Sequence, residues 1–342
     1  MKRRILFLCV VLILVLSTVL TACAKPAPPP TPAPAPKPEP IVLKAVQADY
    51  VGHPLFVGWE WYVKEVNDSA KGELIIDVLG GPEVMPLADQ GDAVAAGAVD
   101  IACNYGSWLE KLVPVMAMWH ARRIGPEEMR KRGAYELIQE EVSKIGVYWL
   151  GPTRELLDSA HWVSINKWVD KPQDLAGLRI ATFAGLAPWM EGLGMIPVIL
   201  PPPERYSAIE RGIADGAAHS LEGQFAFAYH ELPGHDYWID YGAFSSGEMM
   251  IINLETWNNL PEHLRELLID VQLELEAVSE ALSWKEQARV KQGLRDGGMR
   301  PITFSPEDAK WYIDIAYEAE WEKMSEEYPE LAPKILDLWG RP

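Results

Sequence analysis

The sequence predicts an α/β protein of two similar lobes, with a ligand cleft between the lobes and a long helix that spans both. Three observations support this fold class. Strand-like and helix-like segments alternate in β-α-β-α-β order between residues 41 and 105, and the same order recurs between 177 and 220. Apolar residues then recur at helical spacing over 261–297, which predicts one helix of about 35 residues.

The first half of the pattern begins with IVLKAVQA, a segment rich in β-branched and other apolar side chains. Apolar residues at the spacing of one helix face follow it, and Gly72 then precedes a second apolar segment, ELIIDVL. Strands are predicted over 41–48, 73–79 and 99–105, and helices over 54–70 and 87–97.

The second half repeats this order, with strands predicted over 177–183, 196–200 and 214–220 and helices over 187–194 and 203–213. A G-x-x-D-x-A motif follows an amphipathic helix in both halves, at Gly97–Ala102 and at Gly212–Ala217. Glycine suits the C-terminus of a helix and aspartate a turn into a strand. The two motifs therefore suggest that the halves have similar structures.

The rest of the chain completes the expected organisation. Gly297 and Gly298 end the long helix, and another helix is predicted over 306–328. We expect residues 41–160 to form mainly lobe I and residues 161–250 mainly lobe II. Residues 251–342 would supply a crossover strand, the long spanning helix and C-terminal helices.

The first 40 residues predict a signal and a tether. Residues 1–22 have a basic start, an apolar run and small residues before Cys23, which is the pattern of a lipoprotein signal peptide. The alternative is an ordinary secretory signal with an incidental cysteine. Nine prolines between Pro26 and Pro40 favour an extended polyproline II tether over 23–40, with a reach of roughly 55 Å. We therefore expect lipid on Cys23 and an extracytoplasmic body, in the periplasm or at the outer face of the cytoplasmic membrane.

The net charge of the chain excludes some classes of binding partner. The chain carries a formal net charge of −18, and removing the three cations of the signal leaves −21. Such an acidic surface argues against nucleic acid and against broad contact with anionic lipid. Cys103 lies in an apolar stretch and is expected to be a buried small hydrophobe.

The cleft can be placed from the strand order. Ligands of open α/β sheets bind beyond the carboxyl ends of the strands. The loops that matter are then 49–53, 80–86, 104–108, 182–189 and 218–224. The aromatic residues in or beside them, which could belong to the core or to the cleft, are Tyr50, Tyr105, Trp108, Phe183 and Trp189.

Enzyme signatures are not found in the sequence. It has no G-x-x-x-x-G-K-[ST] phosphate loop and no G-x-G-x-x-G. His230 and His235 are five residues apart, and Pro233-Gly234 between them would break the helix that a zinc protease motif needs. We predict no catalytic residues, no metal and no cofactor.

Several spread-out segments together resemble the DctP-type solute receptors of TRAP (tripartite ATP-independent periplasmic) transporters. They are His53-Pro54, Ala70–Glu73, Gly97–Ala102, Lys171–Ile180, Gly212–Gly216, Asn253–Trp257 and Leu260-Pro261. The resemblance implies a two-lobed periplasmic-binding-protein-like fold that closes around a small solute, usually a carboxylate. It also implies delivery of that solute to integral-membrane TRAP subunits that run on an ion gradient.

The chain departs from the family at a residue that matters for binding. The family usually has an arginine on a strand end facing the cleft, where it pairs with the solute carboxylate. Here that position holds Ala181. Arg179 has the same strand parity but lies two residues back, and a surface cation is the favoured interpretation of it. Arg154 matches another family arginine, and it could be a charge clamp for the solute or a structural salt bridge at the hinge.

His219 stands where the family often has asparagine, and Ala218-His219 breaks the Glu-Trp pattern of a metal-containing subgroup. We therefore expect a pocket without metal that is less polar than usual. The ligand-binding residues predicted on these grounds are Arg154, His219, Phe183, Trp108, Tyr105, Asn104, Trp189, Tyr50, His53 and Glu222.

The predicted function is capture of a small organic solute, with an organic acid as the expected class, for a TRAP-type importer. The alternatives are a receptor for an ABC-type importer and a sensory or scaffold module that keeps the fold without transport. A cleft filled by side chains would favour the scaffold.

Overall fold

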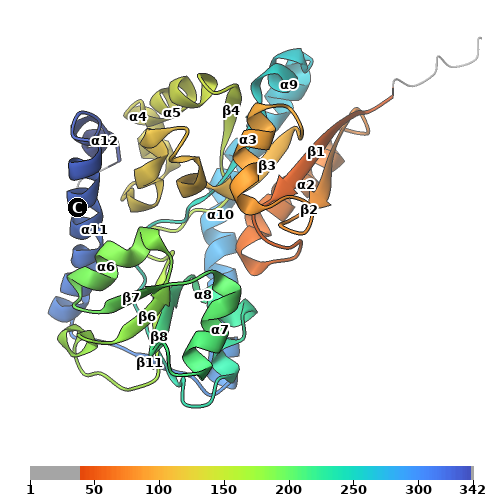
Figure 1. Ribbon diagram of the computed structural model, residues 1–342. Coiled ribbons are helices and arrows are strands. Elements are labelled where there is room, and N and C mark those ends of the chain that lie inside the picture. Colours follow the sequence, from red (N-terminus) through yellow and green to blue (C-terminus); the bar gives the residue numbers. More distant parts are fainter. Residues whose placement is uncertain (1–38, 340–342) are drawn as a thin grey trace, which may run out of the picture. The chain divides into compact units, whose positions relative to one another are not determined.

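The computed structural model describes residues 39–339, which form two α/β lobes (Figure 1). The predicted signal, the tether and lipidation at Cys23 lie outside the described residues. No helix within 39–339 is long and apolar enough to cross a membrane.

Lobe I is built on a five-stranded sheet with the order β2-β1-β3-β10-β4. Its strands are β1 (Ile41–Gln47), β2 (Leu74–Gly80), β3 (Ile101–Tyr105), β4 (Val147–Pro152) and β10 (Glu248–Asn253). The helices beside it are η1 (Pro54–Phe56), α2 (Val57–Ser69), η2 (Leu87–Asp89), α3 (Gln90–Ala95), η3 (Gly106–Leu109), η4 (Pro114–Ala121), α4 (Pro126–Lys131), α5 (Ala134–Ser143) and α9 (Leu254–Asn259). β1 is parallel to β2 and β3, whereas β10 runs antiparallel to both β3 and β4.

Lobe II is built on a six-stranded sheet with the order β11-β9-β5-β8-β6-β7. Its strands are β5 (Trp162–Ile165), β6 (Arg179–Thr182), β7 (Ile196–Ile199), β8 (Gly216–His219), β9 (Tyr237–Ile239) and β11 (Arg300–Ile302). Its helices are η5 (Pro172–Leu175), η6 (Ala184–Leu186), α6 (Ala187–Gly192), α7 (Pro202–Glu210), α8 (Leu221–Ala226) and η7 (Tyr229–Glu231). The parallel unit β7-β6-β8 is the part that the sequence pattern predicted.

Three late helices connect the lobes. α10 (Glu262–Asp296) packs on α2 of lobe I and on α8 of lobe II, which confirms the predicted spanning helix. It ends at Gly297, and Gly298 follows with φ +95°. α11 (Pro306–Glu327) packs on α6, and α12 (Ala332–Trp339) packs on α5 and η4 (Figure 1).

The repeated G-x-x-D-x-A motif has the same role in both sheets. Asp100 accepts a hydrogen bond from the backbone N–H of Lys44 on β1, over 2.8 Å, and its own N–H donates to the carbonyl of Lys44. Asp215 makes the same pair of bonds with Arg179 on β6. Each aspartate thus ties the start of one strand to its parallel neighbour.

Two chain segments cross between the lobes and pair with each other. The first crossing follows β4 and the second precedes β10. The N–H of Ser159 donates to the carbonyl of Phe244, and the N–H of Ser246 donates to the carbonyl of Leu156. The hinge is therefore a hydrogen-bonded pair of strand-like segments.

The sequence predicted a crossover strand after residue 250 without giving its bounds, and β10 begins at Glu248, inside the range expected for lobe II. All six of its residues are buried, so the strand lacks the alternation of apolar and polar residues that marks a half-exposed strand. The predicted helix over 87–97 is also shorter than expected, since this stretch forms the 3₁₀ turn η2 and the six-residue helix α3.

Candidate functional site

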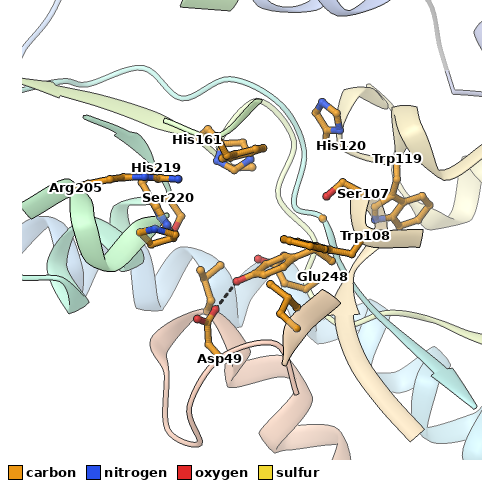
Figure 2. A pocket seen from close by; sticks show the side chains of 17 residues that line it. Asp49, Ser107, Trp108, Trp119, His120, His161, Arg205, His219, Ser220 and Glu248 are labelled. Carbon is orange, nitrogen blue, oxygen red and sulfur yellow. Dashed lines mark hydrogen bonds between the residues drawn. The ribbon is translucent and has the colours of Figure 1, made fainter. Parts of the chain in front are cut away.

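A cavity of about 180 Å³ lies between the lobes. Lobe I lines it with residues that follow β1 and β3 and with the start of β10, and lobe II with residues at the ends of β6 and β8 and the start of α7. Figure 2 shows Arg205, His219 and Ser220 on one side of this cavity and Asp49, Trp108 and Glu248 on another. It has the position expected for a ligand site beyond the carboxyl ends of the strands.

Arg205 is the cation of the cavity. It lies in the first turns of α7 and is 1% exposed. Its Nε donates to the carbonyl of Leu200 over 2.9 Å, and its Nη1 donates to the carbonyl of Ala218 over 3.3 Å. Within residues 39–339 no carboxylate forms a salt bridge with it. Burial lowers the pKa of Arg205, while the hydroxyl of Tyr229 beside it acts in the opposite direction.

Three histidines also line the cavity. Burial lowers the pKa of His161 to about 3, and it lowers the pKa of His219 well below the usual value. Nearby cations, including Arg205, act in the same direction on both. These two imidazoles are therefore neutral at pH 7, so each can both donate and accept a hydrogen bond. The third, His120, has its Nε2 3.7 Å from the buried carboxylate of Glu320.

The lobe I side carries carboxylates. Asp49 accepts a hydrogen bond from the hydroxyl of Tyr105 over 2.5 Å. Glu248 is 3% exposed, and its Oε1 lies 3.8 Å from Nη1 of Arg154. Burial raises the pKa of Glu248, while the guanidinium of Arg154 opposes that rise.

Arg154 does not line the cavity. Its guanidinium is buried and forms a salt bridge with Glu222 of α8, so it connects the first crossing segment to lobe II. Of the two roles that the sequence left open for Arg154, this geometry fits the structural salt bridge rather than the solute clamp. Glu222, also predicted in the site, is its partner there and is fully buried.

Four predicted residues line the cavity: Tyr105, Trp108, Phe183 and His219. The other four lie outside its lining. Trp189 is buried edge-on to Phe244 and Tyr312, Asn104 donates to Gln90, His53 caps η1, and Tyr50 is 47% exposed. Trp189 therefore belongs to the core, which was the alternative for each aromatic residue.

Sequence reasoning missed Arg205, although the rule that located the other loops could have found it. Residues 200–205 follow the carboxyl end of β7, just as the chosen loops follow the ends of the other strands. Arg179, the weaker candidate, instead pairs with Asp215 and has a side chain that is 41% exposed. Ala181 is buried in one cluster with Ala208, which lies one helical turn after Arg205 on α7.

Histidine and carboxylate side chains line the cavity, but among the described residues they do not gather as metal ligands. Within residues 39–339, no cluster of three or more histidine, cysteine, aspartate or glutamate side chains has the geometry to hold a metal ion. The free Cys103 is buried, and burial raises its pKa well above the usual value, so it is not a reactive thiolate.

Comparisons with known proteins agree with this architecture. Residues 51–327 match the family described as bacterial extracellular solute-binding protein, family 7 (DctP). The C4-dicarboxylate-binding periplasmic protein DctP of Rhodobacter capsulatus is 26% identical over 138 residues, which are 40% of this chain and 41% of that protein. The match thus spans less than half the length of that relative.

Two solved structures share the fold. An extracytoplasmic solute receptor of Bordetella pertussis that binds pyroglutamic acid is 18% identical, with a TM-score of 0.73 over 87% of this chain and 99% of that chain. A TRAP periplasmic solute binding protein of Desulfovibrio salexigens with bound orotic acid is 16% identical, with a TM-score of 0.73 over 87% and 97%. With the family match over most of its length and this fold, the chain belongs to family 7 (DctP) of the bacterial extracellular solute-binding proteins.

Proposed function

We propose that the protein captures a small organic acid in the cavity between its lobes and delivers it to the membrane subunits of a TRAP transporter. The observation that carries this proposal is Arg205, a buried guanidinium in the lining that has no carboxylate partner within residues 39–339. A buried charge is stable only when something pairs with it. A solute carboxylate is the partner that matches the fork of the guanidinium.

Arg205 can bind the solute carboxylate in place of the family arginine, whose position Ala181 occupies. Ala181 keeps the end of β6 small, and α7 packs against that strand. The guanidinium thus reaches the cavity from α7 instead of from β6. His219 and Ser220, which line the same side, add neutral hydrogen-bonding groups for the carboxylate.

The cavity also limits the size of the solute. A cavity of roughly 150 Å³ holds a benzene molecule, so 180 Å³ suits an acid with one ring or a short chain. Trp108, Phe183 and Leu55 would contact its apolar part. Pyroglutamic acid and orotic acid, which the two related receptors bind, are acids of this size.

The tether supports a delivery role. Lipid on Cys23 and an extended segment over 23–40 would hold the receptor near the membrane while leaving it free to meet its transporter. The scaffold alternative needs a cleft filled by side chains, and the open cavity does not favour it.

The experiment is calorimetric titration of the purified chain with a panel of small acids and their neutral amides. Arg205→Met should weaken the binding of acids by about 10- to 100-fold, because a hydrogen-bonded charge pair contributes about 1.5–3 kcal/mol. Arg179→Met, on the same lobe but outside the cavity, is the matched control and should bind as the wild type does. Tight binding of the amides alone would contradict the proposal.

A further inference from the structure

We infer that the solute carries a protonated amine as well as its carboxylate, and that Glu248 binds this amine. The inference rests on the proposed function, because it assigns the other end of the acid that Arg205 holds. The solute class is then an amino or imino acid, oriented with its carboxylate toward lobe II and its ammonium toward lobe I.

The first step is the charge of the buried cluster beside the cavity. Glu222 and Glu248 are both at most 3% exposed, and both face the single guanidinium of Arg154. Glu222 forms the close salt bridge, whereas Glu248 is 3.8 Å from Arg154, beyond hydrogen-bond distance. Two carboxylates thus share the guanidinium of Arg154, and Arg122 adds only a smaller electrostatic contribution at Glu248, which is left without a close cation.

The second step is the position of Glu248. It is the first residue of β10 and lines the cavity, and its Oε2 is buried with no hydrogen-bond partner among the described residues. A buried carboxylate oxygen without a donor is costly, so such an atom in a cavity lining indicates that a ligand supplies the donor. The excess negative charge makes a cationic donor the best complement.

The third step is the arrangement across the cavity. Asp49 and Glu248 belong to lobe I, whereas Arg205 and His219 belong to lobe II (Figure 2). Within the described lining, an acid without an amine would neutralise Arg205 but leave Glu248 unpaired. A zwitterion would neutralise both and would bridge the two lobes. An ammonium group brings three donors, enough for Glu248 and a further acceptor such as Asp49.

The test compares matched pairs of acids that differ by the amine alone. Suitable pairs are proline with tetrahydrofuran-2-carboxylate, leucine with 4-methylpentanoate, and phenylalanine with 3-phenylpropanoate. Calorimetric titration at pH 7 should show that the amino acid of the best-binding pair binds at least 10-fold more tightly than its partner. This comparison uses the wild-type protein, so it does not depend on the folding of a variant.

Two variants then assign the preference to a residue. Glu248→Gln keeps the size of the side chain and should remove the preference for the amine, while Arg205→Met should weaken both members of the pair. Glu231→Gln is the matched control, because that glutamate has a side chain that is 66% exposed and lies outside the cavity lining.

The outcomes separate this inference from the proposed function. If both members of each pair bind equally and both depend on Arg205, the organic-acid function stands and the inference that the solute carries an amine is wrong. The same holds if the amine-free acids bind more tightly, which would mean that Glu248 is protonated and donates to the solute. If none of these compounds binds but another acid of the wider panel does, this inference fails and the proposed function stands. If no acid of either set binds, both fail.

Discussion

Burial governs the charge of single residues around the cavity, and His161 makes this testable. The pKa of His161 is about 3 in the folded protein and about 6.5 in an unfolded chain. A histidine with a lowered folded pKa contributes stability that is fully present above pH 6.5 and is lost as the pH falls from 6.5 toward 3. Each bound proton changes stability by up to about 1.4 kcal/mol per pH unit.

The free energy of unfolding of His161→Gln should therefore fall less steeply than that of the wild type as the pH is lowered. Between pH 6.5 and 4.5, its free energy of unfolding should fall by up to about 2.7 kcal/mol less than that of the wild type. Urea titrations at several pH values measure this difference. His263→Gln is the control, since that side chain is 62% exposed. Equal slopes for His161→Gln and the wild type would show that His161 is protonated in the folded protein.

Arg154 gives a second prediction at the scale of the residue. Arg154→Met leaves Glu222 and Glu248 buried without their cation, which should lower the free energy of unfolding by about 3–5 kcal/mol. Burial raises the pKa of both carboxyls, so their contribution to stability is present below pH 4.5 and is lost as the pH rises. The loss in Arg154→Met should therefore be larger at pH 8 than at pH 5.

The matched control for Arg154 is Arg179→Met. Arg179 pairs with Asp215 at the surface, where solvent screens the attraction, so this pair should contribute little to stability. Urea unfolding of the two variants measures the contrast. A similar cost for both, or no dependence on pH for Arg154→Met, would mean that Glu222 and Glu248 are protonated and need no cation.

At the scale of the residue, the sequence could predict those contacts that a repeated or local pattern of residues marks. Asp100 and Asp215 were found because their hydrogen bonds join segments that repeat in order along the chain. The pairing of Arg154 with Glu222 joins residues 68 positions apart, and no local pattern marks it. Arg205 was missed for a different reason, since the rule that placed the cleft loops was not applied to the strand before it.

At the scale of elements, the predicted parts are those with clear periodicity. α10 and the parallel strands were predicted because an amphipathic helix and a short apolar run with flanking glycines are local signals. β4 was not predicted, and β10 was expected only as a crossover strand without bounds, because both strands are largely buried and pair antiparallel with segments distant in the sequence. The sheet of lobe I is therefore completed by strands that only the fold brings together.

The close contact of α2 with the first crossing segment predicts that a larger residue at Gly58 will destabilise the protein. A methyl group on Gly58 would stand 1.8 Å from the carbonyl oxygen of Thr153 and 3.5 Å from Leu275 of α10. Gly58→Ala must push α2 away from the hinge, and overpacking of this kind costs about 1–3 kcal/mol. Gly125→Ala, where nothing lies within 4 Å, should change stability by less than about 0.5 kcal/mol.

Thermal or urea unfolding checks the pair of glycine variants. Because Thr153 is next to Arg154, Gly58→Ala should also weaken the salt bridge that connects the crossing segment to Glu222. A variant as stable as the wild type would show that the close approach of α2 to the hinge can relax without cost, and that this contact does not fix the position of the crossing.

At the scale of the whole molecule, the described body should unfold as one cooperative unit. One hydrophobic cluster includes Trp149 and Ile251 of lobe I together with Val163 and Ile180 of lobe II. α10 packs on both lobes as well. Because each lobe loses part of its core when the other unfolds, tryptophan fluorescence and far-ultraviolet circular dichroism should report the same single urea transition.

A solute held by both lobes should shift that transition without splitting it. A ligand that binds only the folded state stabilises it by about 2.7 kcal/mol at a concentration 100 times its dissociation constant. The wild type should gain this amount with its best acid, and Arg205→Met should gain much less at the same concentration. Two transitions, of which the acid moves only one, would instead mean that the lobes fold separately and that the solute binds one of them alone. The single shifted transition is expected because the cavity lining comes from both sheets, so the binding energy of the solute becomes available only when both lobes are folded.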